Sequence, residues 1–192
     1  MGAADKARVP LRTEAPDFAL KDVRTGEVVR REDFAGKPLL VIFMCNHCPY
    51  VRHVEEKLTE VANDLYRRGL GVVAISANDP EAYPDDAPER LAEQAERLGM
   101  EFPYLFDESQ EVAKAYRAVT TPDLFLYDPE HRLFYRGRFD AARPKQQVPV
   151  TGEDLLEAVR RLEEGEPPPE EQYPSVGCSI KWRPGNEPEY YR

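Results

Sequence analysis

The sequence predicts an α/β fold in which a central mixed β-sheet is flanked by helices. A continuously apolar run, residues 39–44, is typical of a strand that is covered on both faces, and residues 71–77 predict a second buried strand. A helical pattern follows each run, so the chain begins its core as alternating strands and helices, which favours parallel pairing. Two later strands, at residues 124–127 and 133–139, are separated by a short turn and predict an antiparallel hairpin. Parallel strands followed by an antiparallel hairpin give a mixed sheet.

The N-terminal part predicts an arm and a small hairpin before the first buried strand. Residues 1–15 are polar and predict an arm. Two short strand patterns, residues 17–20 and 27–30, flank the turn signal Thr25-Gly26 and predict a β-hairpin.

Each predicted helix combines an apolar stripe with a start or stop signal. After the first strand, apolar residues recur at spacings of three and four: Val51, Val54, Leu58, Val61 and Leu65. Basic residues and Gly69 predict the end of this helix. The predicted helices span about residues 47–67, 88–98, 107–116 and 151–162.

The chain length fits one domain with additions at both ends. We expect residues 16–165 to form the domain and residues 166–192 to form a proline-rich linker followed by a C-terminal segment. This segment contains Val176, Ile180 and Trp182, which is too apolar for a solvated tail. We therefore expect it to dock on the domain.

Two cysteines stand at the predicted junction between the first buried strand and the following helix. The motif is Cys45-Asn46-His47-Cys48-Pro49. Unpaired N–H groups and the positive end of the helix dipole favour a thiolate there, and a cationic His47 would act in the same direction. The sequence therefore predicts Cys45 as the nucleophile with a lowered pKa, and Cys48, one turn into the helix, as the resolving thiol.

The chain resembles the thioredoxin superfamily, and in particular its TlpA/ResA-like, AhpC/TSA-type redoxin branch. The resemblance rests on the strand–CxxC–helix order, on Thr121-Pro122 far downstream, and on the start at Pro16-Asp17-Phe18 before a hairpin. It covers about residues 15–164 and implies a thioredoxin-like fold with an N-terminal β-hairpin and a C-terminal extension.

The resemblance also implies an activity and a substrate platform. It implies a thiol–disulfide oxidoreductase that reduces disulfides in partner proteins, is recycled by a thiol-reducing system and needs no bound cofactor. A cis peptide bond between Thr121 and Pro122 would face the CxxC motif and present backbone groups to an extended substrate. Met44 replaces the usual tryptophan, and the strand before Cys45 has no buried acid. Asp123 is the candidate substitute for that acid, with a solvated turn residue as the alternative.

A thiol peroxidase is the alternative enzyme. Peroxiredoxins place a proline and a serine or threonine before the reactive cysteine, in a PxxxTxxC pattern. Pro38 stands at the wrong spacing from Cys45, and the run between them offers no hydroxyl group. The peroxidase therefore ranks second.

A metal-binding role is the second alternative, although we expect no metal. Three cysteines and three histidines make a Cys3His zinc site arithmetically possible, but there is no second CxxC pair. Copper binding would require His131, which the pattern places in a hairpin turn where solvation is the simpler expectation. His53 falls off the apolar stripe and is expected to be solvated. Cys178 is either a third thiol brought near the CxxC motif or a small apolar residue under the docked tail.

Charge and hydropathy exclude some partners. Acidic residues (36) outnumber basic residues (26), giving a formal charge of −10, which disfavours nucleic acid. No apolar run is long enough to span a bilayer, and the N-terminus lacks a signal-peptide core, so we expect no membrane insertion and a cytoplasmic location. In that compartment a cysteine pair favours redox chemistry over a structural disulfide. The composition also hints at a heat-adapted source, while the oligomeric state stays open.

Overall fold

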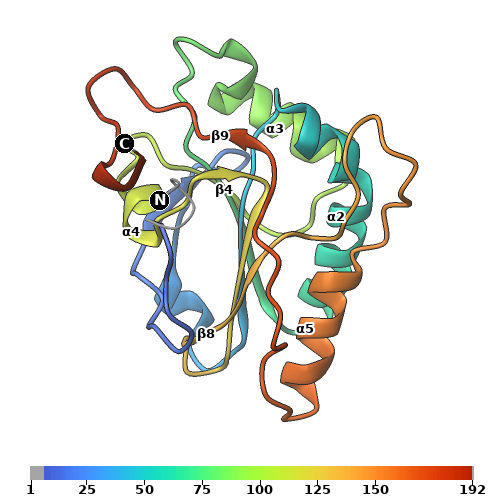
Figure 1. Ribbon diagram of the computed structural model, residues 1–192. Helices are drawn as coiled ribbons and strands as arrows, with labels where there is room; N and C mark the ends of the chain where they lie inside the picture. Colours follow the sequence, from blue (N-terminus) through green and yellow to red (C-terminus); the bar gives the residue numbers. More distant parts are fainter. Residues whose placement is uncertain (1–6, 192) are drawn as a thin grey trace.

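The computed structural model describes residues 7–191, and its centre is a seven-stranded mixed sheet (Figure 1). The strand order is β2-β1-β5-β4-β3-β7-β8. The strands are β1 (Ala19–Asp22), β2 (Val28–Arg30), β3 (Leu39–Phe43), β4 (Gly71–Ser76), β5 (Tyr104–Phe106), β7 (Asp123–Tyr127) and β8 (Leu133–Gly137). β3, β4 and β5 are parallel, whereas β1, β2, β7 and β8 pair antiparallel with their neighbours. The predicted mixed sheet and N-terminal hairpin are confirmed.

The central strand β3 carries the chain into the CxxC motif. All five of its residues are buried, because both faces of the sheet are covered. It pairs in parallel with β4 from Leu39 opposite Gly71, and antiparallel with β7 from Leu39 opposite Tyr127. Pairing on both sides fixes where β3 ends, and therefore where Cys45 lies.

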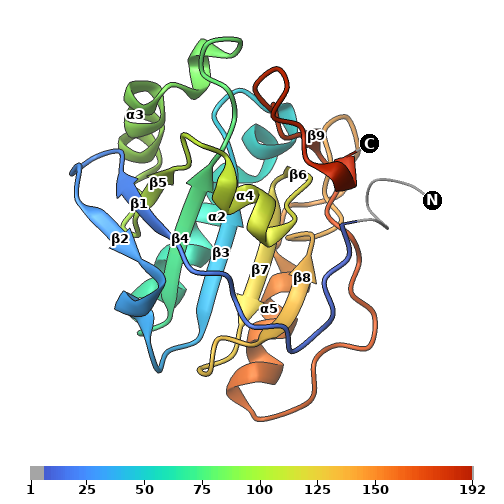
Figure 2. The same ribbon diagram turned by 90° about the vertical axis from the view of Figure 1, so that its left-hand side faces the viewer.

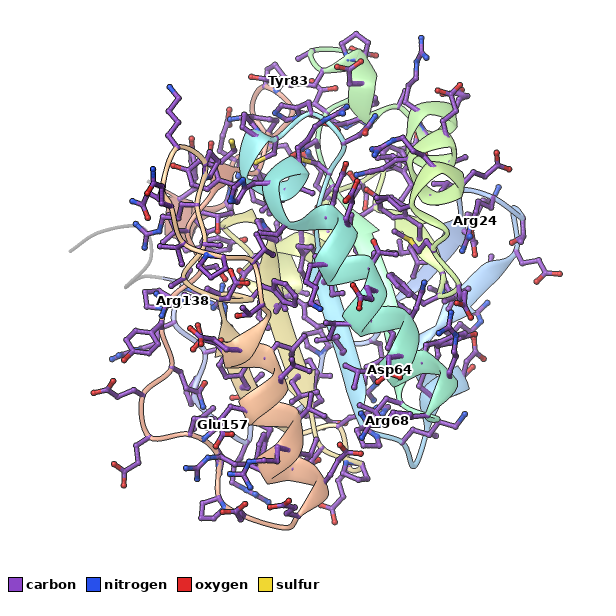
Figure 3. The ribbon with its side chains drawn as sticks, turned by 90° about the vertical axis from the view of Figure 1, so that its right-hand side faces the viewer. Arg24, Asp64, Arg68, Tyr83, Arg138 and Glu157 are labelled. Carbon is purple, nitrogen blue, oxygen red and sulfur yellow. The ribbon has the colours of Figure 1, made fainter. Side chains whose placement is uncertain are left out.

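Helices cover the two faces of the sheet unequally. One face carries α2 (Pro49–Arg67), α3 (Pro88–Leu98) and α5 (Glu153–Glu163), whose apolar residues share one core with alternate residues of β3, β4 and β7. Figure 3 shows α2 and α5 side by side, and an ion pair between Arg68 and Glu163 joins them. The other face carries the short α4 (Glu111–Tyr116) (Figure 2). Within residues 7–191, none of the helices combines the length and apolarity that crossing a membrane requires.

The start of α2 differs from the sequence-based expectation. We expected the helix to begin near His47, but it begins at Pro49, and Cys48 is its N-cap residue with an extended backbone (φ −68°, ψ 124°). Proline favours the first helical position because its missing N–H is not needed there. Cys48, rather than Cys45, therefore stands at the positive end of the helix.

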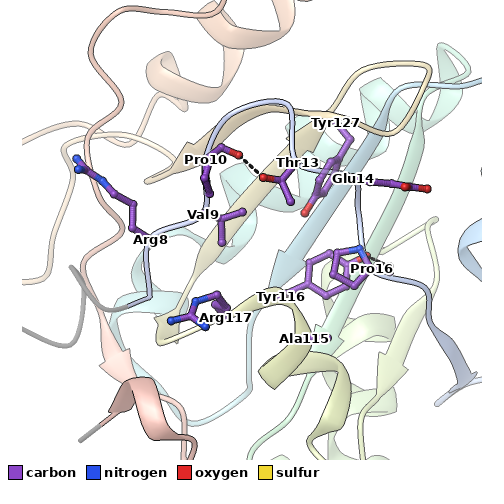
Figure 4. Close-up of a pocket in the computed structure, with 10 residues that line it drawn as sticks. All are labelled: Arg8, Val9, Pro10, Thr13, Glu14, Pro16, Ala115, Tyr116, Arg117 and Tyr127. Carbon is purple, nitrogen blue, oxygen red and sulfur yellow. Dashed lines mark hydrogen bonds between the residues drawn. The ribbon is translucent and has the colours of Figure 1, made fainter.

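The N-terminal arm packs along the hairpin formed by β7 and β8. The backbone N–H of Arg12 donates to Leu133 O at 2.8 Å, and that of Ala15 donates to His131 O at 2.8 Å. The first part of the predicted arm, residues 1–6, lies outside the described residues. A pocket of about 190 Å³ separates the arm from α4; its lining includes Val9 and Tyr116 but no cysteine (Figure 4).

His131 is not the solvated turn residue that we expected. It is 6% exposed, and its Nε2 lies 3.0 Å from both Phe34 O and Lys37 O, to which it donates. Lys37 precedes β3, whereas the CxxC motif follows it, so His131 lies at the opposite end of the strand from the cysteines. It therefore cannot join Cys45 and Cys48 in a copper site.

The C-terminal segment crosses the sheet edge near the CxxC motif. β9 (Cys178–Ser179) pairs antiparallel with β6 (Thr120–Thr121), the two residues before Pro122 (Figure 2). Beyond β9 the chain reaches α4, where the Tyr190 hydroxyl donates to Ala118 O at 2.8 Å. Two segments more than fifty residues apart in the sequence thus form one small sheet.

Candidate active site

Cys45 and Cys48 lie between the end of β3 and the start of α2, and both are free thiols. Both residues are fully buried, with 0% of their surface exposed to solvent. They belong to the apolar core on the α2 face of the sheet, which also contains Met44 and Val51. Burial disfavours the charged form of a thiol, so a cysteine in this core ionises only where hydrogen-bond donors or nearby charges favour its thiolate.

The peptide bond between Thr121 and Pro122 is cis, and it places Thr121 against both cysteines. The Thr121 hydroxyl oxygen lies 3.5 Å from Cys45 Sγ, and the Thr121 carbonyl oxygen lies 3.6 Å from Cys48 Sγ. The structure therefore brings Cys45, Cys48 and Thr121 together beside the cis-proline Pro122.

Hydrogen-bond donors surround Cys48 and lower the pKa of its thiol to about 4. The largest contribution is a hydrogen bond from the Cys45 thiol, and further donors are the Cys178 thiol, the Val51 backbone N–H and the Thr121 hydroxyl. Burial acts in the opposite direction. When protonated, the Cys48 thiol donates to the Thr121 carbonyl oxygen at 3.6 Å. The donors prevail because a thiolate accepts all four, and the Val51 N–H belongs to the unpaired groups at the helix N-terminus.

The pKa of Cys45 moves the other way, well above its usual value. The main cause is its hydrogen bond to Cys48, which requires that Cys45 keep its proton; burial and the negative charge of Asp86 add to the effect. The expectation of a lowered pKa at Cys45 is therefore wrong for this geometry. The physical reason is that the two thiols share one hydrogen bond, in which Cys45 keeps its proton and Cys48 accepts it; the Val51 N–H at the start of α2 adds a further donor to Cys48.

His47 is held by a carboxylate that the sequence analysis did not identify. Its Nδ1 contacts Asp86 Oδ2, and its ring stacks on Tyr83 with 4.7 Å between the ring centroids. Figure 3 shows Tyr83 near the end of the molecule where α2 begins. A cationic His47 would thus be paired with Asp86, so its field at the cysteines is largely compensated.

Asp86 organises the loop between the two cysteines. It is 0% exposed, and its Oδ1 accepts the backbone N–H groups of Asn46 at 2.7 Å and His47 at 3.1 Å. Its Oδ2 also accepts the Asn78 amide at 3.0 Å. The only sequence signal for this role was the acidic, proline-rich loop at residues 78–87, which does not reveal which acid faces the motif.

A buried polar network supports Cys45 from below. Gln94 Nε2 donates to Cys45 O at 3.0 Å and to Glu55 Oε2 at 3.1 Å, while the Tyr104 hydroxyl donates to Gln94 Oε1 at 2.8 Å. Glu55 is 4% exposed and pairs with Arg97 at 2.9 Å. The buried acid missing from β3 thus has a counterpart on α2, although its contacts reach the backbone of Cys45 and not a sulfur.

Asp123 is neither a solvated residue nor a direct partner of the thiols. It is 2% exposed, and its Oδ2 pairs with Arg136 at 3.0 Å. Its Oδ1 accepts the Ser175 hydroxyl at 2.8 Å. Asp123 therefore anchors the C-terminal segment beside the cis peptide bond.

Cys178 lies next to the pair, on the docked segment. It is opposite Thr121 in the β6–β9 ladder, packs against the core that contains Cys45 and Cys48, and hydrogen-bonds to Cys48. Cys178 is half-buried, whereas the other two cysteines are fully buried. The structure thus brings the third thiol to the site.

The capacity to hold a metal is small. Cys45, His47 and Asp86 each offer one ligand atom, and these atoms lie within 4.8 Å of one another. Both Asp86 oxygens, however, already accept the N–H groups described above, so the cluster is satisfied without a cation. His53 is exposed on α2 and takes no part in the cluster.

Comparison with known proteins places this site in a family. The curated ResA thiol-disulfide oxidoreductase of Geobacillus kaustophilus (strain HTA426) is 27% identical over 124 residues, covering 65% of this chain and 67% of that protein. The crystal structure of an uncharacterized conserved protein from Geobacillus kaustophilus is 50% identical, with a TM-score of 0.89 over 93% of this chain and 95% of that chain.

The fold has more distant matches as well. A thiol:disulfide interchange protein of the thioredoxin family from Chlorobium tepidum TLS has a TM-score of 0.61 at 18% identity, over 81% of this chain and 99% of that chain, which confirms the thioredoxin-like fold. Residues 11–136 match the AhpC/TSA family. With two thirds of its length in that match and with the expected cis-proline facing its cysteine pair, the chain belongs to the AhpC/TSA family.

Proposed function

We propose that this thiol–disulfide oxidoreductase reduces disulfides in partner proteins, with Cys48 as the attacking sulfur and Cys45 as the resolving sulfur. This reverses the roles expected from the sequence. The observation that carries the proposal is the set of four hydrogen-bond donors around Cys48, which keeps its pKa near 4 and makes it the thiolate of the pair at neutral pH.

The proposed reaction has two exchange steps. The Cys48 thiolate attacks one sulfur of the substrate disulfide, and the other substrate sulfur leaves as a thiolate that takes a proton from water. Cys45 then loses its proton, attacks Cys48 Sγ and releases the second substrate thiol. The substrate gains two electrons and two protons, and the enzyme is left with a Cys45–Cys48 disulfide.

The surrounding residues have distinct parts in this proposal. Thr121 and Pro122 present the backbone edge along which a substrate strand would pair once β9, which pairs with this edge in the structure, moves aside. His47 and Asp86 fix the loop between the cysteines. The proposed location of the protein is a reducing cytoplasm, where a thiol-reducing system would return the Cys45–Cys48 disulfide to two thiols.

The experiment that tests the roles compares two single variants in the reaction with oxidised glutathione. We expect Cys45→Ser to react, since it retains the Cys48 thiolate. We expect Cys48→Ser to react more slowly, since it lacks that thiolate and since burial and Asp86 still oppose ionisation of Cys45. Insulin reduction with dithiothreitol should be lost in Cys48→Ser, which lacks the attacking sulfur. If Cys48→Ser reacted like the parent while Cys45→Ser did not, the roles would be those first expected.

A thiol peroxidase is the second candidate. The observation that favours it is the Thr121 hydroxyl, which lies 3.5 Å from Cys45 Sγ and donates to Cys48. It supplies the hydroxyl group that the sequence before Cys45 lacks. Consumption of hydrogen peroxide by the reduced protein, compared with insulin reduction, distinguishes the two activities.

A further inference from the structure

The C-terminal segment occupies the backbone edge that the proposed function assigns to substrates. In the β6–β9 ladder, Cys178 lies opposite Thr121 and Ser179 lies opposite Thr120. The pairing continues with the Ile180 N–H, which donates to Val119 O at 2.9 Å. An extended segment of the chain itself therefore lies where an extended substrate would add a strand.

The close approach of this segment depends on a glycine. A Cβ atom on Gly177 would lie 1.9 Å from Thr121 O, well inside any real contact. On one side of Gly177, the Ser175 hydroxyl binds Asp123; on the other, the Lys181 N–H donates to Asn78 Oδ1 at 2.8 Å. Hydrogen bonds therefore hold the segment on both sides of Cys178, and between these bonds the segment packs closely against Thr121.

Cys178 is the residue that this segment directs at the cysteine pair. Residues opposite each other in an antiparallel ladder share a face, so Cys178 and Thr121 face the same side. On that side lie Cys45 and Cys48, and the Cys178 thiol hydrogen-bonds to Cys48. Cys178 is half-buried, whereas both members of the pair are fully buried. Of the three cysteine residues, Cys178 is the one that is partly exposed to solvent.

We propose that Cys178 is a third redox-active cysteine, which takes the disulfide from the buried pair and passes it to an external dithiol. This inference rests on the proposed function, because it concerns how the oxidised enzyme is reduced again. It goes beyond that function because it assigns a step to a residue outside the CxxC motif.

The exchange needs no oxidant other than the substrate disulfide. In the oxidised enzyme, Cys178 loses its proton and attacks Cys48 Sγ, the Cys45–Cys48 bond breaks, and Cys45 leaves and takes up a proton. An external dithiol then attacks Cys178 Sγ, and Cys48 leaves as a thiolate. The second thiol of the reductant finally displaces Cys178, so the reductant ends as a disulfide and the enzyme as three thiols.

Two effects set the order of these steps. Cys178 attacks Cys48 first because Cys48 is the sulfur that it contacts, although Cys45 is the poorer leaving group. Leaving-group chemistry then directs the attack of the external dithiol. A thiol of low pKa leaves faster, and attack at the accessible sulfur is the faster attack. In a Cys48–Cys178 disulfide these two preferences coincide, since Cys178 is the more exposed residue and Cys48 is the better leaving group. Burial and the bond to Cys48 raise the pKa of Cys178 to about 11 in the reduced enzyme, but the second cause disappears once Cys48 is in a disulfide.

The test follows the fate of the glutathione adduct on Cys48 by peptide mapping under non-reducing conditions. Reduced Cys45→Ser is treated with oxidised glutathione; we expect it to lose the adduct and to form a Cys48–Cys178 disulfide. The double variant Cys45→Ser/Cys178→Ser should keep the adduct. The control Cys45→Ser/Cys178→Ser/Ser179→Cys moves the thiol to the opposite face of the strand, and it should keep the adduct too.

The outcomes separate this inference from the proposed function. If Cys45→Ser keeps its adduct as the double variant does, Cys178 is not redox-active and the inference is overturned, while the proposed function stands. If no variant acquires an adduct on Cys48, the proposed function fails and this inference falls with it. In the otherwise unmodified enzyme, Cys178→Ser should slow reduction of the oxidised form by dithiothreitol by on the order of tenfold; an unchanged rate would also overturn the inference. Circular dichroism of each variant verifies that it folds.

Discussion

The ionisation of Cys48 offers the sharpest test of the site, because the sequence and the structure assign the thiolate to different residues. With a pKa of about 4, Cys48 should be almost fully ionised at pH 6. An ordinary cysteine, with a pKa of about 8.5, would be only about 0.3% ionised at that pH. The difference corresponds to roughly 6 kcal/mol in favour of the thiolate form.

The measurement is the thiolate absorbance near 240 nm of the reduced protein as a function of pH. Absorbance suits this site because neither buried cysteine needs to be reached by a reagent. We expect one thiolate to titrate far below pH 6 in the parent and to be absent from Cys48→Ser at that pH. Cys45→Ala and Cys178→Ala each remove one weak S–H donor and should raise the midpoint by about one unit.

Two results would refute this reasoning. One is a parent protein without any thiolate below pH 8, which would mean that burial outweighs the donors. The other is a low-pH thiolate that survives in Cys48→Ser and disappears in Cys45→Ser, which would return the thiolate to the residue predicted from the sequence. Cys178→Ser is the matched control, because it retains a hydroxyl donor in place of the thiol.

Three further predictions concern stability and access. Because the folded-state pKa of Cys48 is lowered, its thiolate stabilises the folded protein fully above about pH 8.5, and this stabilisation is lost as the pH falls toward 4, at up to ~1.4 kcal/mol per pH unit. The unfolding free energy of the reduced parent minus that of Cys48→Ser should show this slope. A difference that does not change with pH would contradict the prediction. Asp86→Ala leaves the N–H groups of the CxxC loop and His47 without their buried acceptor, so it should lower the free energy of unfolding measured in urea by ~3–5 kcal/mol. Asp86→Asn should lower it less. If both variants lost the same free energy, the negative charge of Asp86 would have no role. Gly177→Ala should force the C-terminal segment away from Thr121 and destabilise its docked state by ~1–3 kcal/mol. Iodoacetamide should therefore alkylate Cys48 roughly 5- to 150-fold faster than in the parent, whereas the control Ser179→Ala should change the rate little. An alkylation rate equal to that of the parent would mean that the segment adjusts without opening.

Local patterns were enough to predict most of the elements. The helix at residues 88–98 was predicted with the bounds observed for α3, because Pro88 marks its start and Gly99 adopts the left-handed conformation that ends it (φ 66°). The buried strands were equally clear from their continuous apolar runs. The start of α2 was missed by two residues, and this small difference moved the helix N-terminus from Cys45 to Cys48.

Contacts between distant segments were beyond such patterns. Asp86 and His131 could not be placed from the sequence, since one acid in an acidic loop and one histidine in a turn look the same whether solvated or buried. Gly177 is another example: a side chain is excluded at this position because it would collide with the carbonyl oxygen of Thr121, more than fifty residues earlier in the sequence.

By itself, the sequence determined the fold class and the cysteine pair at a strand–helix junction, because each depends on periodicity or on a short motif. The cis peptide bond before Pro122 was expected from the resemblance to the thioredoxin superfamily, and the structure contains it. Only the tertiary structure decided which donors and charges surround each sulfur and what covers the pair. The reason is physical: the pKa of a buried thiol depends on donors and charges that come from four separate parts of the chain, around residues 45–51, 86, 121 and 178. Their meeting point is set by packing, which no single stretch of the sequence encodes.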